Sequence, residues 1–191
     1  MTMLTLLLSA TLAASPAPLT PELLRERYAG LRSLEADVLQ VKAGRFWALP
    51  FQSRIRFRYT SGRVVWETLA PVHSVAIIQG DQLTVTGADG KAREMGGLSA
   101  DPRMTALLRF LRTLMAVDLI GLERYFVLAY GPREVVARPR PTSDLKLFEA
   151  IRLHFDDDAE LTGLDLETAT ERTRLTFEHT VRDPPPPAPR R

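Results

Sequence analysis

Residues Phe51–Tyr59 read FQSRIRFRY, and this stretch decides the fold. Apolar side chains and arginines alternate in this stretch. The apolar residues are at odd-numbered positions, namely Phe51, Ile55, Phe57 and Tyr59, and the arginines are at even-numbered ones, namely Arg54, Arg56 and Arg58. Strict alternation predicts a half-buried β-strand. We expect the three arginines to face away from the core and to pair with acidic neighbours such as Glu67.

Similar strands and tight turns follow this stretch along the chain. Ser61-Gly62, Gly80-Asp81 and Asp89-Gly90 are turn dipeptides that predict strands over 63–69, 73–79, 82–86 and 91–95. The strand over 73–79 is apolar on both parities, so we expect it to be covered on both sides. Later strands are predicted over 125–130, 134–138, 151–155, 161–167 and 172–181.

Two segments carry helical periodicity instead. Thr20 is suited to cap a helix that has Pro21 at its first position, and this helix is predicted to end near Ser33. A second helix, predicted from Asp101 to near Asp118, is the clearest amphipathic one, with Met104, Leu107, Leu108, Leu111, Leu114 and Met115 at spacings of three and four. The sheet must curl or split at this strand number, so its concave face is the place for this helix.

The two ends of the chain differ from the middle. Residues 1–14 read MTMLTLLLSATLAA, an apolar run closed by small residues, which is typical of a secretory signal cleaved after Ala13 or Ala14. The alternative is a buried N-terminal helix. Residues 183–191 are rich in proline and predict a disordered tail. Residues 15–182 are then a single domain that works outside the cytoplasm.

Composition and motifs argue against catalysis. Of 191 residues, 45% are hydrophobic and 25% charged, as in ordinary globular proteins, and no residue is cysteine. Disulfides, thiolate metal sites and a lipidated cysteine on the chain are therefore excluded. His73, His154 and His179 lack metal-binding spacing, and no GxSxG, P-loop or GxGxxG is present. We expect no enzyme activity, no metal and no cofactor.

Nucleic-acid binding is also not expected. The arginines over 54–58 lie on the parity opposite the aromatic side chains, so charge and stacking platform would not meet.

A set of apolar residues remains without an assigned role. These candidate ligand-binding residues are Trp47, Phe57, Trp66, Ile77 and Leu83 in strands and Leu108, Leu111 and Met115 in the central helix. If everything packs to normal density, they form an ordinary core. If the helix is a movable cover, they line a cavity of lipid size.

The order of elements resembles the periplasmic outer-membrane lipoprotein carriers, the LolA-like family, over nearly the whole mature chain. The resemblance rests on Leu34–Gln40 (LEADVLQ) after the first helix, on Val65–Pro71 (VWETLAP) and on Ala76–Leu83 (AIIQGDQL). The family carries an Arg-Pro some six residues before its Trp, where this chain has Thr60-Ser61-Gly62. Arg58 or Arg63 is the candidate replacement for the lid-latching arginine of the family.

The resemblance implies an α+β fold. It would be an incomplete antiparallel β-barrel of about 10–11 strands, with an N-terminal helix and a mid-chain lid helix over a hydrophobic cavity. It implies a monomeric periplasmic carrier for the acyl chains of a lipoprotein or related lipid. Its partners would be an inner-membrane donor and an outer-membrane acceptor protein. A lipid- or peptide-sensing module on the same fold and an envelope enzyme are the alternatives.

Overall fold

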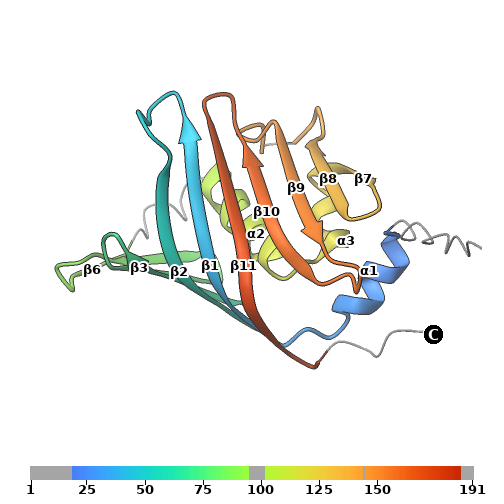
Figure 1. Cartoon of the computed structure of the whole chain (residues 1–191), viewed down its shortest axis with the longest axis horizontal. Helices are drawn as coiled ribbons and strands as arrows, with labels where there is room; N and C mark the ends of the chain where they lie inside the picture. Colours follow the sequence, from blue (N-terminus) through green and yellow to red (C-terminus); the bar gives the residue numbers. More distant parts are fainter. Residues whose placement is uncertain (1–18, 95–101, 144, 186–191) are drawn as a thin grey trace, which may run out of the picture.

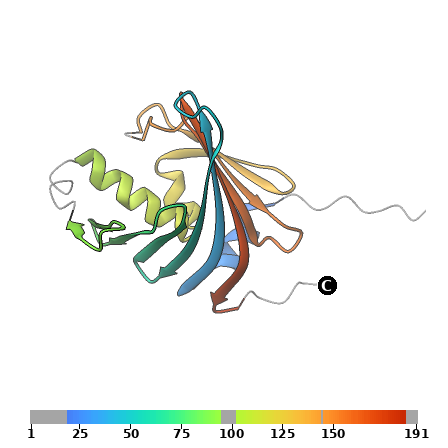
Figure 2. The ribbon, with the colours of Figure 1, turned by 60° about the vertical axis from the view of Figure 1, so that its left-hand side comes forward.

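One long antiparallel sheet curves around the helices of the chain (Figures 1 and 2). The computed structural model describes residues 19–94, 102–143 and 145–185. Its helices are α1 (Pro21–Tyr28), α2 (Pro102–Met115) and α3 (Leu119–Glu123). Its strands are β1 (Ser33–Gly44), β2 (Phe51–Thr60), β3 (Arg63–Ala70), β4 (Ser74–Gln79), β5 (Gln82–Thr86), β6 (Ala92–Glu94), β7 (Phe126–Tyr130), β8 (Glu134–Pro139), β9 (Ala150–Phe155), β10 (Leu161–Glu167) and β11 (Glu171–Asp183).

The strand order explains why the sheet is an open half-barrel. The 11 strands run β6-β5-β4-β3-β2-β1-β11-β10-β9-β8-β7, so two meanders are joined by the pairing of β1 with β11. Strands β6 and β7 are the two free edges, and α2 and α3 connect them along the chain. Figure 2 shows α2 inside the curve of the sheet. The incomplete barrel predicted from the sequence is confirmed.

The predicted alternation of β2 is also confirmed. Phe57 is fully buried and pairs with Ala36 of β1 and Trp66 of β3, while Arg56 pairs with Asp37 and Glu67. Neighbours in an antiparallel register share a face. The arginines therefore lie on the convex face, as predicted, and Arg58 forms an ion pair with Glu67 at 3.6 Å.

A second cluster of ion pairs on the convex face centres on Asp165 of β10. Its side chain is 1% exposed and accepts hydrogen bonds from Arg174 at 2.8 and 3.0 Å and from Arg172 at 3.2 Å. His154 lies 3.3 Å away. Burial alone would raise the pKa of Asp165, but the hydrogen bonds from Arg174 and His154 and the arginine charges outweigh it and lower the pKa to about 2.

The core lies between the helices and the concave face of the sheet, with buried side chains from both halves of the sheet. Phe110 of α2 packs between Phe126 and Phe148, with 5.3 Å between ring centroids in each pair. Leu108 and Leu114 of the same helix are also buried. The amphipathic pattern of this helix therefore predicts its packing correctly.

The structure corrects the predicted ends of both helices. Helix α1 ends at Tyr28 rather than near Ser33, because Ala29 is extended and Gly30 has a φ of 70°. Helix α2 ends at Met115, three residues before the predicted end. Val117 then reverses the chain with a φ of 52°, and the side chain of Asp118 caps the separate helix α3.

Two expectations about strands were wrong. Strand β4 lies between β3 and β5, but Val75 and Ile77 on its convex face are half-exposed, so it is not covered on both sides. The predicted tail begins too early, because Asp183 still pairs with Ser33 in the sheet and binds Arg32. The predicted signal segment, residues 1–14, and the last residues of the tail, 186–191, lie outside the described residues.

Candidate functional site

Apolar side chains on the concave side of the sheet and on α2 contact the core but remain only partly buried. We call five of them the concave wall: Trp66 of β3, Leu83 of β5, Leu107 and Leu111 of α2, and Leu166 of β10. The strand registers place Trp66, Leu83 and Leu166 on the same face as Phe57. Tyr59 of β2 and Leu128 of β7 are also only partly buried on this face, whereas Ile55 and Phe57 of β2 are buried.

Two of the predicted strand residues contact one another at this wall. The rings of Phe57 and Trp66 meet edge to face, with 6.0 Å between centroids and an interplanar angle of 70°. Phe57 is fully buried, whereas Trp66 is half-buried. Phe57 is therefore positioned to support Trp66, and Trp66 presents the accessible surface. Leu83 lies two strands away on the same face.

The predicted helical residues divide into two kinds. Leu108 is 2% exposed and Met115 is also buried, so both belong to the core. Leu111 is half-buried, like Leu107 one turn before it. Leu107 and Leu111 thus form a partly covered apolar stripe on α2. This stripe can contact a ligand while the helix stays folded.

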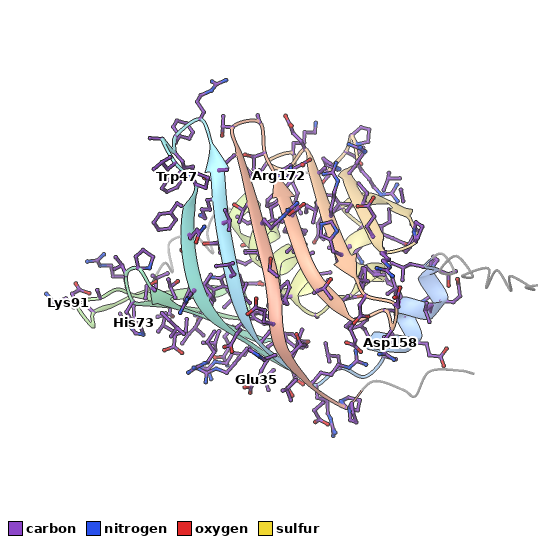
Figure 3. The ribbon with its side chains drawn as sticks, viewed as in Figure 1. Glu35, Trp47, His73, Lys91, Asp158 and Arg172 are labelled. Atoms are coloured by element: carbon purple, nitrogen blue, oxygen red, sulfur yellow. The ribbon has the colours of Figure 1, made fainter. Side chains whose placement is uncertain are left out.

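Two of the predicted residues lie elsewhere. Ile77 pairs with Val65 and Thr84, on the convex face, opposite the concave wall. Trp47 lies in the hairpin tip, residues 45–50, between β1 and β2 (Figure 3). It stacks on Phe51 at 5.0 Å and donates a hydrogen bond from Nε1 to Oε2 of Glu171 at 2.7 Å.

One ion pair fastens the outer side of α2 to the sheet. Arg109 donates from Nε and Nη2 to the two carboxylate oxygens of Asp81, at 3.2 and 2.8 Å. Asp81 lies in the turn between β4 and β5, and we call this pair the latch. The hydrogen bond from Arg109 lowers the pKa of Asp81, and the same bond raises the pKa of Arg109. Both groups therefore stay charged at neutral pH.

Neither arginine proposed as the family's latching residue has that position. Arg58 points to the convex face and pairs with Glu67, and Arg63 is exposed at the start of β3. In the latch of this chain, the arginine lies on the helix and the carboxylate lies in a turn of the sheet.

Sequence reasoning missed Leu107, Leu166 and both latch residues as members of this site. Leu107 was visible as part of the helical stripe. The sequence places Asp81 only in a turn, and Arg109 has no role in the sequence analysis. A contact between residues 28 positions apart leaves no periodic signal in either segment.

Within the described ranges, no cluster of three or more His, Asp or Glu side chains is arranged to hold a metal ion. In the same part of the chain, no helix is long and apolar enough to cross a membrane.

No protein-family model matches the sequence, and no curated protein matches it. Solved structures with a similar fold include a DUF1329 family protein from Desulfovibrio piger (10% identity, TM-score 0.49), with 85% of this chain and 91% of that chain covered. Another is the lipoprotein LppX of Mycobacterium tuberculosis (16% identity, TM-score 0.42), with 88% and 99% covered. A third is the LolA superfamily protein NE2245 of Nitrosomonas europaea (10% identity, TM-score 0.45), with 86% and 94% covered.

Proposed function

We propose that this protein is a periplasmic carrier that shelters the acyl chains of a lipoprotein or related lipid and moves them toward the outer membrane. The observation that carries the proposal is the concave wall, a set of half-buried apolar side chains on the two sides of one helix–sheet boundary. These side chains offer an apolar surface that the described residues cover only in part, and an acyl chain could complete that cover.

The energetics of acyl transport require such a shelter. Each methylene exposed to water costs about 0.8 kcal/mol, so a free acyl chain does not cross an aqueous compartment efficiently. Trp66 of β3, Leu83 of β5 and Leu111 of α2 offer it apolar contact from three elements. Release requires an element that moves while the sheet stays folded. Helix α2 is fastened on its outer side by the exposed latch, a contact that is weak in water and screened by salt.

The hairpin tip supports delivery to a membrane. Phe46 is 75% exposed and Leu49 is 80% exposed, which is unusual for large apolar side chains. The tip is held firmly, because Arg45 N donates to Thr170 O at 3.0 Å and Trp47 is bound to Glu171. A Cβ atom on Gly44 would lie 2.3 Å from Thr170 O, so this close approach needs glycine. We infer that the tip contacts the membrane at which cargo is received or released.

Export is a separate part of the proposal. Residues 1–14 would be removed, leaving Ala14 or Ser15 as the mature N-terminus of a monomeric periplasmic protein. N-terminal sequencing of the protein from the periplasmic fraction checks this, and an intact Met1 on cytoplasmic protein would contradict it.

The binding proposal is tested by solvent extraction of the purified protein followed by mass spectrometry. We expect a co-purified lipid with acyl chains, and we expect Leu111→Gln to retain much less of it. Val127→Gln is the matched control, because Val127 is a similarly large apolar residue that is exposed on β7. Equal lipid in both variants, or none in the parent, would contradict the proposal. Transfer of the lipid between donor and acceptor vesicles then distinguishes a carrier from a sensing module.

A further inference from the structure

A cationic depression lies outside the junction of α2 and α3. It encloses about 450 Å³, and its lining includes Arg109, Arg112 and Thr113 of α2 together with Arg124 and Tyr125 after α3. Tyr59 and Gly62, at the end of β2 and in the turn that follows, form part of its opposite side. Arg109, Arg112 and Thr113 stand at helical spacings of three and four, so one face of α2 brings them together.

The positive charge in this depression is only partly compensated. Asp81 is bonded to Arg109 and lies 4.0 Å from Arg112, so one carboxylate serves two guanidinium groups. Asp118, also in the lining, is used as the cap of α3. The Arg124 side chain forms no ion pair with any described residue. Three arginines therefore face two carboxylates, one of which is already occupied by the backbone.

The Nε donor of Arg112 has no hydrogen-bond acceptor among the described residues. The side chain is 27% exposed, but this Nε atom is buried. A buried N–H without an acceptor costs free energy, and a planar guanidinium matches two oxygens of one anion. Tyr59 and Tyr125 also line the depression, and a tyrosine hydroxyl is a donor of the kind that holds phosphate oxygens.

We propose that this depression binds a phosphate-type anion, as carried by the headgroup of an anionic lipid, and that the bound anion competes with Asp81 for Arg109 and Arg112. Binding would then loosen the latch at the same time. This consequence rests on the proposed function, because it matters only if α2 covers an acyl chain. The binding step itself does not depend on it.

The test is calorimetric titration of the intact protein with glycerol phosphate and with inorganic phosphate, beside sedimentation with vesicles of phosphatidylglycerol or phosphatidylcholine. Saturable binding of phosphate-bearing anions that weakens with salt supports the site. Binding confined to glycerol phosphate and phosphatidylglycerol identifies a lipid headgroup, and equal binding of inorganic phosphate identifies the free anion. Absence of binding in all arms would overturn the proposal.

Three variants should change the affinity for the anion in opposite directions. Arg124→Gln, at an exposed position, and Arg112→Gln should each weaken anion binding by about tenfold, and Asp81→Asn should strengthen it because it frees two arginines. Arg138→Gln, on an exposed arginine of β8, is the control and should change nothing. An equal loss in the control would show non-specific attraction and overturn the site. A loss of anion binding with acyl binding intact would leave the proposed carrier function standing.

Discussion

The carboxylate of Asp81 receives two hydrogen bonds from Arg109, and this exposed pair joins the turn between β4 and β5 to the outer side of α2. This polar contact holds α2 to the turn between β4 and β5, while the next residue, Phe110, packs its ring against Phe126 of β7. We propose that α2 opens at this exposed pair while the packing of Phe110 stays intact.

Removing the latch should change ligand exchange more than stability. In Asp81→Asn the bidentate ion pair is lost, but both groups are exposed, so the free energy of unfolding should change little. We expect release of a fluorescent fatty acid to become severalfold faster in stopped-flow measurements. The parent should approach the same rate in high salt, which screens the pair. A rate that is unaffected by both changes would show that the pair does not restrain α2.

Two leucines of the same helix should respond differently to truncation. Leu108→Ala removes a buried side chain and should lower the free energy of unfolding by about 2–5 kcal/mol. Leu111→Ala removes a half-buried one and should cost about 2 kcal/mol or less, yet it should weaken binding of the acyl probe. Chemical denaturation and probe titration on both variants check this. Large destabilisation by Leu111→Ala with unchanged probe affinity would make α2 an ordinary core helix.

Asp165 should make the protein sensitive to acid. Its pKa is about 2 in the folded chain and about 4 when unfolded, so its ion pairs stabilise the fold above pH 4 and this contribution is lost as the pH falls toward 2. The shift corresponds to about 2 kcal/mol. Asp165→Asn should therefore be less stable than the parent at pH 6, and the difference should shrink between pH 4 and pH 2. If the difference in unfolding free energy between Asp165→Asn and the parent is the same at pH 6 and at pH 2, this prediction is contradicted.

The hairpin tip should contribute to membrane contact. Phe46→Ser combined with Leu49→Ser should lower binding to lipid vesicles by about tenfold or more. The reason is that the variant removes less apolar surface from water when it binds. Val72→Ser combined with Val181→Ser is the control, since both valines are well exposed, one between β3 and β4 and the other on β11. Vesicle flotation measures the difference. If both double variants float with the vesicles to the same extent, the tip does not contribute to membrane contact.

Local periodicity predicted most of the fold. The alternation around Phe57 and the three-and-four spacing around Leu108 each fix one face of one element, and the structure has both faces as expected. Strand 82–86 and strand 161–167 have the predicted bounds because turn residues mark both of their ends. The pairing of β1 with β11 joins distant parts of the chain, and no local pattern in either segment predicts it.

The candidate site was less predictable for a physical reason. Strand β4 is apolar at every position from Val75 to Ile78, so its sequence does not indicate which parity faces inward. The register with β3 places Ile78, not Ile77, on the concave face. Similarly, Leu108 and Leu111 look equivalent on a helical stripe, and only the packing of the sheet around α2 buries one and leaves the other half-exposed.

The two tryptophans of the chain allow the most direct test, because Trp66 belongs to the concave wall and Trp47 lies in the hairpin tip. A brominated fatty acid quenches the fluorescence of a tryptophan ring that it contacts. In Trp47→Phe, which retains only Trp66, we expect saturable quenching by the monomeric brominated fatty acid and none by its unbrominated counterpart. In Trp66→Phe, which retains only Trp47, we expect little quenching. Quenching of Trp47 alone, or of neither ring, would contradict an acyl-binding site at the concave wall.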